Sequence, residues 1–133
     1  MTAEEIVKYW VDDANENLKT MNTLYKAKDY TWSLFMGHLM IEKLLKGLYA
    51  KVNKDNPYAP KSHDLVLLAK KCGLEIDKDK QNILYAITTF NISARYEDYK
   101  NTFRNKCTIE YTEKQLENIE EMRKWIIKEL EMR

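Results

Sequence analysis

Hydrophobic residues recur every three or four positions along four long stretches of the chain, which is the spacing of one face of a helix. The first stretch follows a capping box formed by Thr2 and Glu5, and it predicts a helix that runs to about Lys26. Its apolar positions are Ile6, Trp10, Ala14, Leu18, Met21 and Tyr25.

The second stretch predicts the central helix of the fold. Asp29 can cap this helix, which continues to roughly Val52. Its apolar surface is unusually broad, and it consists of Leu34, Ile41, Leu44, Leu45, Leu48 and Val52. A helix that is apolar on most sides is usually surrounded by other helices. We therefore expect the remaining helices to pack around it.

A polar segment, residues 53–62, follows and holds both prolines. We expect Ser62 to cap a short third helix from His63 to Lys71, with Gly73 ending it. A fourth helix is predicted from Asp79 to about Tyr96, and its buried positions are Ile83, Ile87, Phe90 and Ala94.

Periodicity is lost over residues 97–111. A second capping box, Thr112 to Gln115, then predicts the last helix. Its buried positions are Leu116, Ile119, Ile126 and Leu130. The predicted fold is an all-α, up-down antiparallel helical bundle of four long helices and one short one.

Composition supports one helical domain over residues 1–133. Three Gly and two Pro are too few for a sandwich or barrel, and a net charge of +1 gives no reason to expect a nucleic-acid binder. Cys72 and Cys107 stand in no metal-binding or disulfide pattern. No stretch approaches the ~20 apolar residues that span a bilayer, so we expect a cytoplasmic protein. We expect neither a metal nor a cofactor.

The central helix also carries polar residues. His38, Glu42 and Lys46 recur every four positions and form one polar stripe along it. A charged group on a buried helix must be paired, reach water through its own length, or bind a ligand. The stripe is thus the first candidate for a functional site.

The order of these signals resembles the HEPN domain. The resemblance is carried by His38 and Glu42-Lys43-Leu-Leu-Lys46 on the second helix, then His63-Asp64-Leu65, then Ala94-Arg95-Tyr96. It covers nearly the whole chain. It implies an all-α bundle, usually a homodimer, that often occurs in prokaryotes beside a minimal nucleotidyltransferase and is proposed to bind nucleotides. Many catalytic relatives are RNases, commonly toxins, that use an Arg followed several residues later by a His.

This sequence departs from the RNase pattern. Its histidines, at 38 and 63, both precede its first arginine at 95, so no Arg-then-His motif exists at any spacing. No imidazole follows Arg95 to act as a general base toward a ribose hydroxyl. We therefore assign no catalytic residue, and we favour a protein that is not an enzyme.

The resemblance and the stripe together suggest a nucleotide site formed by His38, Glu42, Lys43, Lys46, His63, Arg95 and Tyr96. Lysines and arginine would hold phosphates, and Tyr96 would stack on a base. Each group also has a purely structural interpretation. Lys46 can pair with Glu42 one turn away, Arg95 can form a salt bridge to Glu42 across the bundle, and Asp64 in the first turn of a helix favours the helix dipole.

Three hypotheses follow. The first is a non-catalytic HEPN domain that binds an ATP-like nucleotide or a nucleotidyltransferase partner, in a toxin-antitoxin-like or substrate-binding system. The second is a protein-interaction bundle with no small ligand. The third, and weakest, is an RNase that uses other residues. For the homodimer, surplus aromatic and apolar side chains suggest Trp32, Phe35 and Met36 as the contact face.

Overall fold

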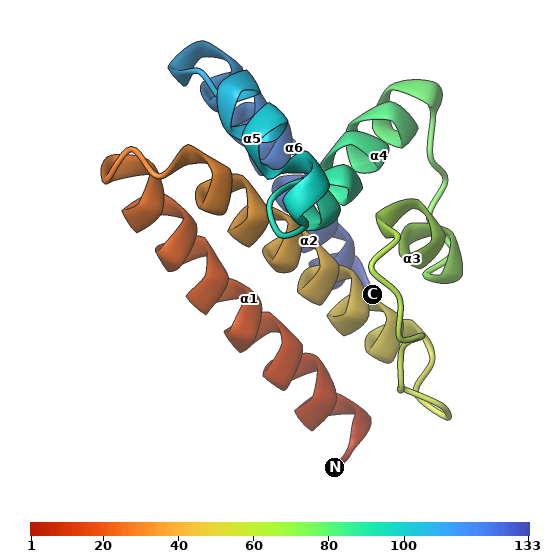
Figure 1. Ribbon diagram of the computed structural model, residues 1–133. Coiled ribbons are helices and arrows are strands. Elements are labelled where there is room, and N and C mark those ends of the chain that lie inside the picture. The colour runs from red at the N-terminus through yellow and green to blue at the C-terminus, as the bar shows by residue number, and fades with distance from the viewer.

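The computed structural model describes residues 1–133 as six α-helices, with no strand (Figure 1). The all-α prediction is therefore confirmed, with one helix more than expected. The helices are α1 (Ala3–Lys26), α2 (Tyr30–Val52), α3 (Leu65–Lys71), α4 (Lys78–Ser93), α5 (Glu97–Lys106) and α6 (Ile109–Met132).

The first two helices form an antiparallel hairpin (Figure 1). The capping box at the start of α1 is present as predicted: the Glu5 N–H donates to Thr2 Oγ1 at 3.1 Å, and the Thr2 N–H donates to Glu5 Oε1 at 2.9 Å. Only three residues join α1 to α2, and Lys28 makes the reversal with a positive φ of 64°. The short turn places α1 along the full length of α2.

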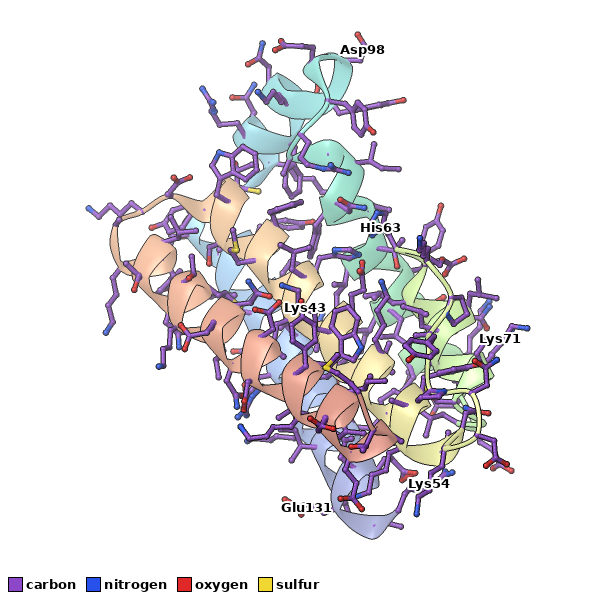
Figure 2. All side chains as sticks on the ribbon, turned by 90° about the horizontal axis from the view of Figure 1, so that it is seen from below. Lys43, Lys54, His63, Lys71, Asp98 and Glu131 are labelled. Carbon is purple, nitrogen blue, oxygen red and sulfur yellow. The ribbon has the colours of Figure 1, made fainter.

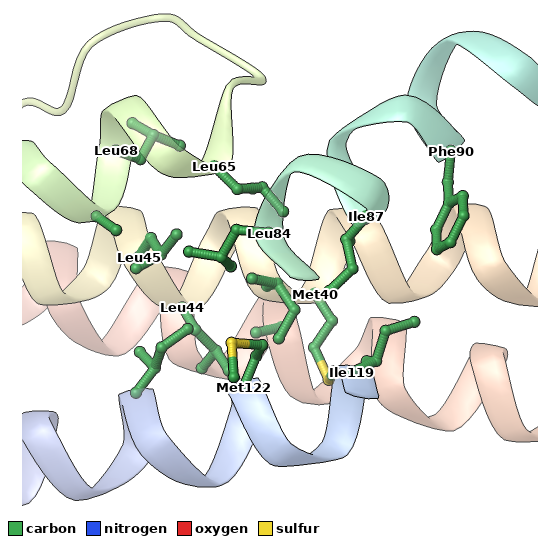
Figure 3. Close-up of a cluster of buried hydrophobic side chains, with 14 of the residues drawn as sticks. Met40, Leu44, Leu45, Leu65, Leu68, Leu84, Ile87, Phe90, Ile119 and Met122 are labelled. Carbon is green, nitrogen blue, oxygen red and sulfur yellow. The ribbon is translucent and has the colours of Figure 1, made fainter. Parts of the chain in front are cut away.

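The second helix is central, as its broad apolar surface predicted. It packs against each of the other five helices. Figure 3 shows its core side chains, with α3 and α4 on one side and α6 on the other. The labelled residues of this core are Met40, Leu44, Leu45, Leu65, Leu68, Leu84, Ile87, Phe90, Ile119 and Met122. Gly37 lets α6 come close, because a Cβ there would lie 2.5 Å from Cδ1 of Ile119.

Three predicted helix starts were wrong. Asp64 caps α3 by accepting the Leu67 N–H at 3.2 Å, in place of Ser62. Asp77 caps α4 in place of Asp79. Asp64 lies directly before the first buried residue of its helix, Leu65, whereas Asp77 lies about two turns before the first buried residue of α4, Leu84.

The start of α6 shows the same kind of error. Thr108 caps it by accepting the Tyr111 N–H, and α6 therefore begins several residues earlier than the Thr112–Gln115 box suggested. Thr112 instead lies buried inside the helix, where its hydroxyl has no partner. Asp29 occupies the predicted cap position of α2, but its side chain makes no capping hydrogen bond.

Residues 97–106, where the sequence shows no periodicity, form α5. This helix buries only Phe103, whose ring lies 5.6 Å from that of Phe90. A helix anchored by one side chain has no repeating apolar face to detect. At the end of α3, by contrast, Gly73 adopts the predicted terminating conformation, with φ 78°. None of the six helices has the length and apolar composition needed to cross a bilayer.

Candidate functional site

The polar stripe of α2 is the centre of a hydrogen-bonded cluster, which we call the Glu42 network: His38, Glu42, Lys46 and His63. The Glu42 side chain is 7% exposed. Its Oε2 accepts a hydrogen bond from Lys46 Nζ at 3.0 Å, and its Oε1 accepts one from His63 Nδ1 at 2.7 Å. The buried carboxylate is thus paired on both oxygens, which is what burial of a charge requires.

His38 is completely buried and fastens the loop before α3 to the central helix. Its Nε2 lies 3.1 Å from the backbone carbonyl oxygen of His63, to which it donates. In the neutral ring Nδ1 then carries the lone pair, and this atom is buried without a partner. Burial lowers the pKa of His38, although the His63 carbonyl and the Glu42 carboxylate both oppose that effect. We conclude that His38 is a neutral structural group.

Both lysines of the predicted site already have partners in the protein. Lys46 Nζ is paired with Glu42 and also lies 5.4 Å from the centre of the Trp10 ring on α1. Lys43 Nζ lies 2.7 Å from Oδ2 of Asp13, also on α1. The two lysines therefore join α1 to α2, and neither has a charge left uncompensated.

Arg95 is in a different situation. It is exposed, follows the end of α4 and forms no ion pair, so the structural alternative, a salt bridge to Glu42, is not formed. Its Nε donates to the Asn91 carbonyl at 2.9 Å. The guanidinium lies 5.7 Å from the ring centre of Phe35 and 5.4 Å from that of Tyr96. The Nε edge of the guanidinium is thus fixed, and the N–H groups of its two terminal nitrogens make no hydrogen bond within the protein.

His63 and Tyr96 supply the other accessible groups. The His63 side chain is 61% exposed, and its Nε2 makes no hydrogen bond within the protein. Tyr96 is 53% exposed at the start of α5. Figure 2 shows charged side chains over the outside of all the helices, with Asp98 and Glu131 at opposite ends of the molecule. Arg95 differs from most of these charges in lying close to two aromatic rings.

The structure therefore divides the seven predicted site residues into three groups. His38, Glu42, Lys46 and His63 form one network, Arg95 and Tyr96 form a second cluster, and Lys43 belongs to the contact with α1. Sequence reasoning missed Phe35 as the platform under Arg95 and assigned it to a dimer face. Its position three residues before His38, on the same helix, was the available signal.

The residues proposed for the dimer face are all half-buried. Trp32 and Phe35 pack edge to face, with ring centres 5.4 Å apart, and both rest on the core together with Met36. The large side chains that are clearly exposed near this region are Ile92, Tyr96 and Tyr99. That Trp32, Phe35 and Met36 meet a second copy of the chain stays a prediction.

An all-α fold around a central helix with a buried, fully paired carboxylate defines the class of protein as a helical bundle domain. Within that class the family can be stated, because the sequence model of the HEPN domain matches residues 7–130. The chain belongs to the HEPN family. Neither a curated protein nor a solved structure matches it significantly.

Proposed function

We propose that this protein is a non-catalytic HEPN domain that binds a nucleotide through Arg95 and Tyr96. The observation that carries the proposal is the state of Arg95, an exposed guanidinium without an ion pair that lies 5.7 Å from the ring centre of Phe35 and 5.4 Å from that of Tyr96. HEPN domains often belong to toxin-antitoxin or RNase systems. The absence of any Arg-then-His motif argues against the RNase role for this member.

The groups would act by recognition. The terminal nitrogens of Arg95 donate to phosphate oxygens, and the fixed Nε limits the entropy lost when they do so. Tyr96 offers an exposed ring on which a base can stack. Glu42 and Lys46 are paired with each other inside the protein, so neither offers its charge to a ligand. The proposed set of phosphate-binding residues is therefore smaller than the sequence suggested, because it excludes Lys43 and Lys46.

The physiological setting is a further part of the proposal. By likeness to the family, we expect a homodimer that works beside a minimal nucleotidyltransferase protein in a toxin-antitoxin or substrate-binding system. A second candidate function, protein docking without a ligand, is favoured by one observation. Ile92, Tyr96 and Tyr99 are exposed close together in the chain around the α4–α5 turn.

Calorimetric titration with ATP tests the proposal. The parent protein should bind, and Arg95→Met should weaken binding by about tenfold or more, the value of one charged hydrogen bond. Arg104→Met is the matched control, because Arg104 is also exposed and unpaired but lies on α5. It should leave the affinity unchanged. No binding by the parent at millimolar ATP would reject the nucleotide role and favour docking, and RNA cleavage lost in His63→Asn would reject the non-catalytic role.

A further inference from the structure

The imidazole of His63 is held more rigidly than an exposed side chain usually is. Nδ1 donates to the buried Glu42 carboxylate at 2.7 Å, and the backbone carbonyl of the same residue accepts from His38 at 3.1 Å. Because the two ring nitrogens lie on opposite sides of an imidazole, Nε2 is directed away from Glu42. The protein therefore presents one ring nitrogen of fixed orientation that has no partner of its own.

His63 and the guanidinium of Arg95 both lie against α2. Phe35 of α2 supports the guanidinium, whereas His38 and Glu42 hold His63. At about 1.5 Å per residue, Phe35 is roughly 5 Å from His38 and roughly 10 Å from Glu42 along the helix axis. The charge of Arg95 also acts on His38, where it adds to the main effect of burial in lowering the pKa. The two exposed groups thus lie over neighbouring turns.

We propose that His63 is a second phosphate ligand of this site and takes up a proton at Nε2 when a nucleoside di- or triphosphate bridges it to Arg95. This inference rests on the nucleotide binding proposed above and adds two properties to it. The site prefers a chain of two or three phosphates over a single phosphate, because the two contacts are separated along α2. Binding is also coupled to proton uptake.

The coupling follows from the hydrogen bond to Glu42. Since that bond keeps a proton on Nδ1, a neutral ring presents a lone pair at Nε2, which repels a phosphate oxygen. Only the protonated ring can donate to the ligand. Histidine is the side chain that changes charge between about pH 5 and 8, so a bound anion can favour the protonated form of the ring near neutral pH.

The surrounding charges permit this protonation. Glu42 contacts the ring directly, and Asp64, the next residue, uses its carboxylate to cap α3. Lys46 on α2 and Arg95 after α4 are positive and oppose protonation. The single charge of Glu42 is shared between Lys46 and His63, so the phosphates of the ligand would supply the negative charge that balances Arg95 and the protonated ring. His38, on α2, is buried and bonded to the His63 backbone, so it does not reach the ligand.

The test is calorimetric titration of ADP and AMP in two buffers of different ionisation enthalpy at the same pH, slightly above neutral. His63→Asn is the informative variant, because the Asn amide nitrogen replaces Nδ1 and can still donate to Glu42, while Nε2 is removed. ADP itself titrates near neutral pH, so the difference between parent and variant is the quantity compared. Circular dichroism verifies that the variant folds.

The expected result is that the parent takes up more protons per ADP than His63→Asn does. The parent should also prefer ADP to AMP by about tenfold, the value of one charged hydrogen bond, and the variant should lose that preference. ADP binding with equal proton uptake in the two proteins would overturn the inference and leave the proposed function intact. No ADP or AMP binding by the parent would overturn both. If the variant fails to fold, the parent's preference for ADP over AMP remains as the test, and equal affinities for the two nucleotides would contradict the proposal.

Discussion

Oε2 of Glu42 lies 3.0 Å from Nζ of Lys46, and the two side chains are only 7% and 11% exposed. This ion pair joins consecutive turns of the central helix inside the bundle. It is the reason why a stripe of charged residues can occur on an otherwise apolar helix. The pair also distinguishes Lys46, whose charge is used inside the protein, from Arg95, whose charge is accessible.

Replacing Lys46 by Met should therefore reduce the free energy of unfolding by about 3 to 5 kcal/mol, because Glu42 would lose its charged partner. Lys43→Met is the control, since its pair with Asp13 is closer to the surface. We expect it to cost about 1 kcal/mol or less. Urea denaturation measures both values. Small and equal losses in the two variants would contradict the structural role of Lys46.

His38 should make stability dependent on pH. Burial lowers its pKa in the folded protein below the ordinary value of 6.5, so the unfolded chain binds the proton more readily. The stability that neutral His38 contributes is complete above about pH 6.5 and is lost as the pH falls toward its folded value. The unfolding free energy should therefore fall between about pH 7 and pH 5.

His38→Gln isolates this effect, because the Gln amide can still donate to the His63 carbonyl but does not titrate. The two proteins differ only at residue 38, so a difference in their pH dependence reports on that side chain. The variant should lose less stability than the parent over the same pH interval. Equal pH dependence in denaturation experiments would rule out a neutral, buried His38.

The two threonines at the start of α6 should respond in opposite ways. Thr108→Ala removes the cap of the Tyr111 N–H and should cost about 1 kcal/mol. Thr112→Val should be neutral or stabilising, because the buried hydroxyl that it removes has no hydrogen-bond partner. Thermal unfolding of both variants tests this. A larger loss for Thr112→Val would restore the sequence-based cap.

Helices with a repeating apolar face could be predicted from the sequence, and α1 and α2 were predicted to within a residue or two. The caps were less certain because several candidates precede the same helix, such as Asp77 and Asp79 before α4. A carboxylate is favourable both as a cap and within the first turn of a helix, so the sequence does not distinguish the two positions. The short helix α5 could not be predicted, since Phe103 alone buries it.

The candidate site was predictable to the same degree. The pairing of Glu42 with Lys46 follows from a four-residue spacing on one helix, and the structure confirms it. The hydrogen bond from His63 to Glu42 joins residues 21 positions apart, so it depends on how the loop before α3 returns to α2. The position of Arg95 over Phe35 depends in the same way on how α4 packs.

Arg95 is, in our proposal, the ligand-binding cation of this domain. Its Nε–H is bonded to the Asn91 carbonyl, so it should give a resolved signal in ¹H–¹⁵N spectra, among only four arginines in the chain. Titration with ADP should shift the Arg95 signal and leave that of Arg123, which is paired with Glu120 on α6, in place. An unchanged Arg95 signal at saturating ADP, or shifts confined to other arginines, would contradict the account.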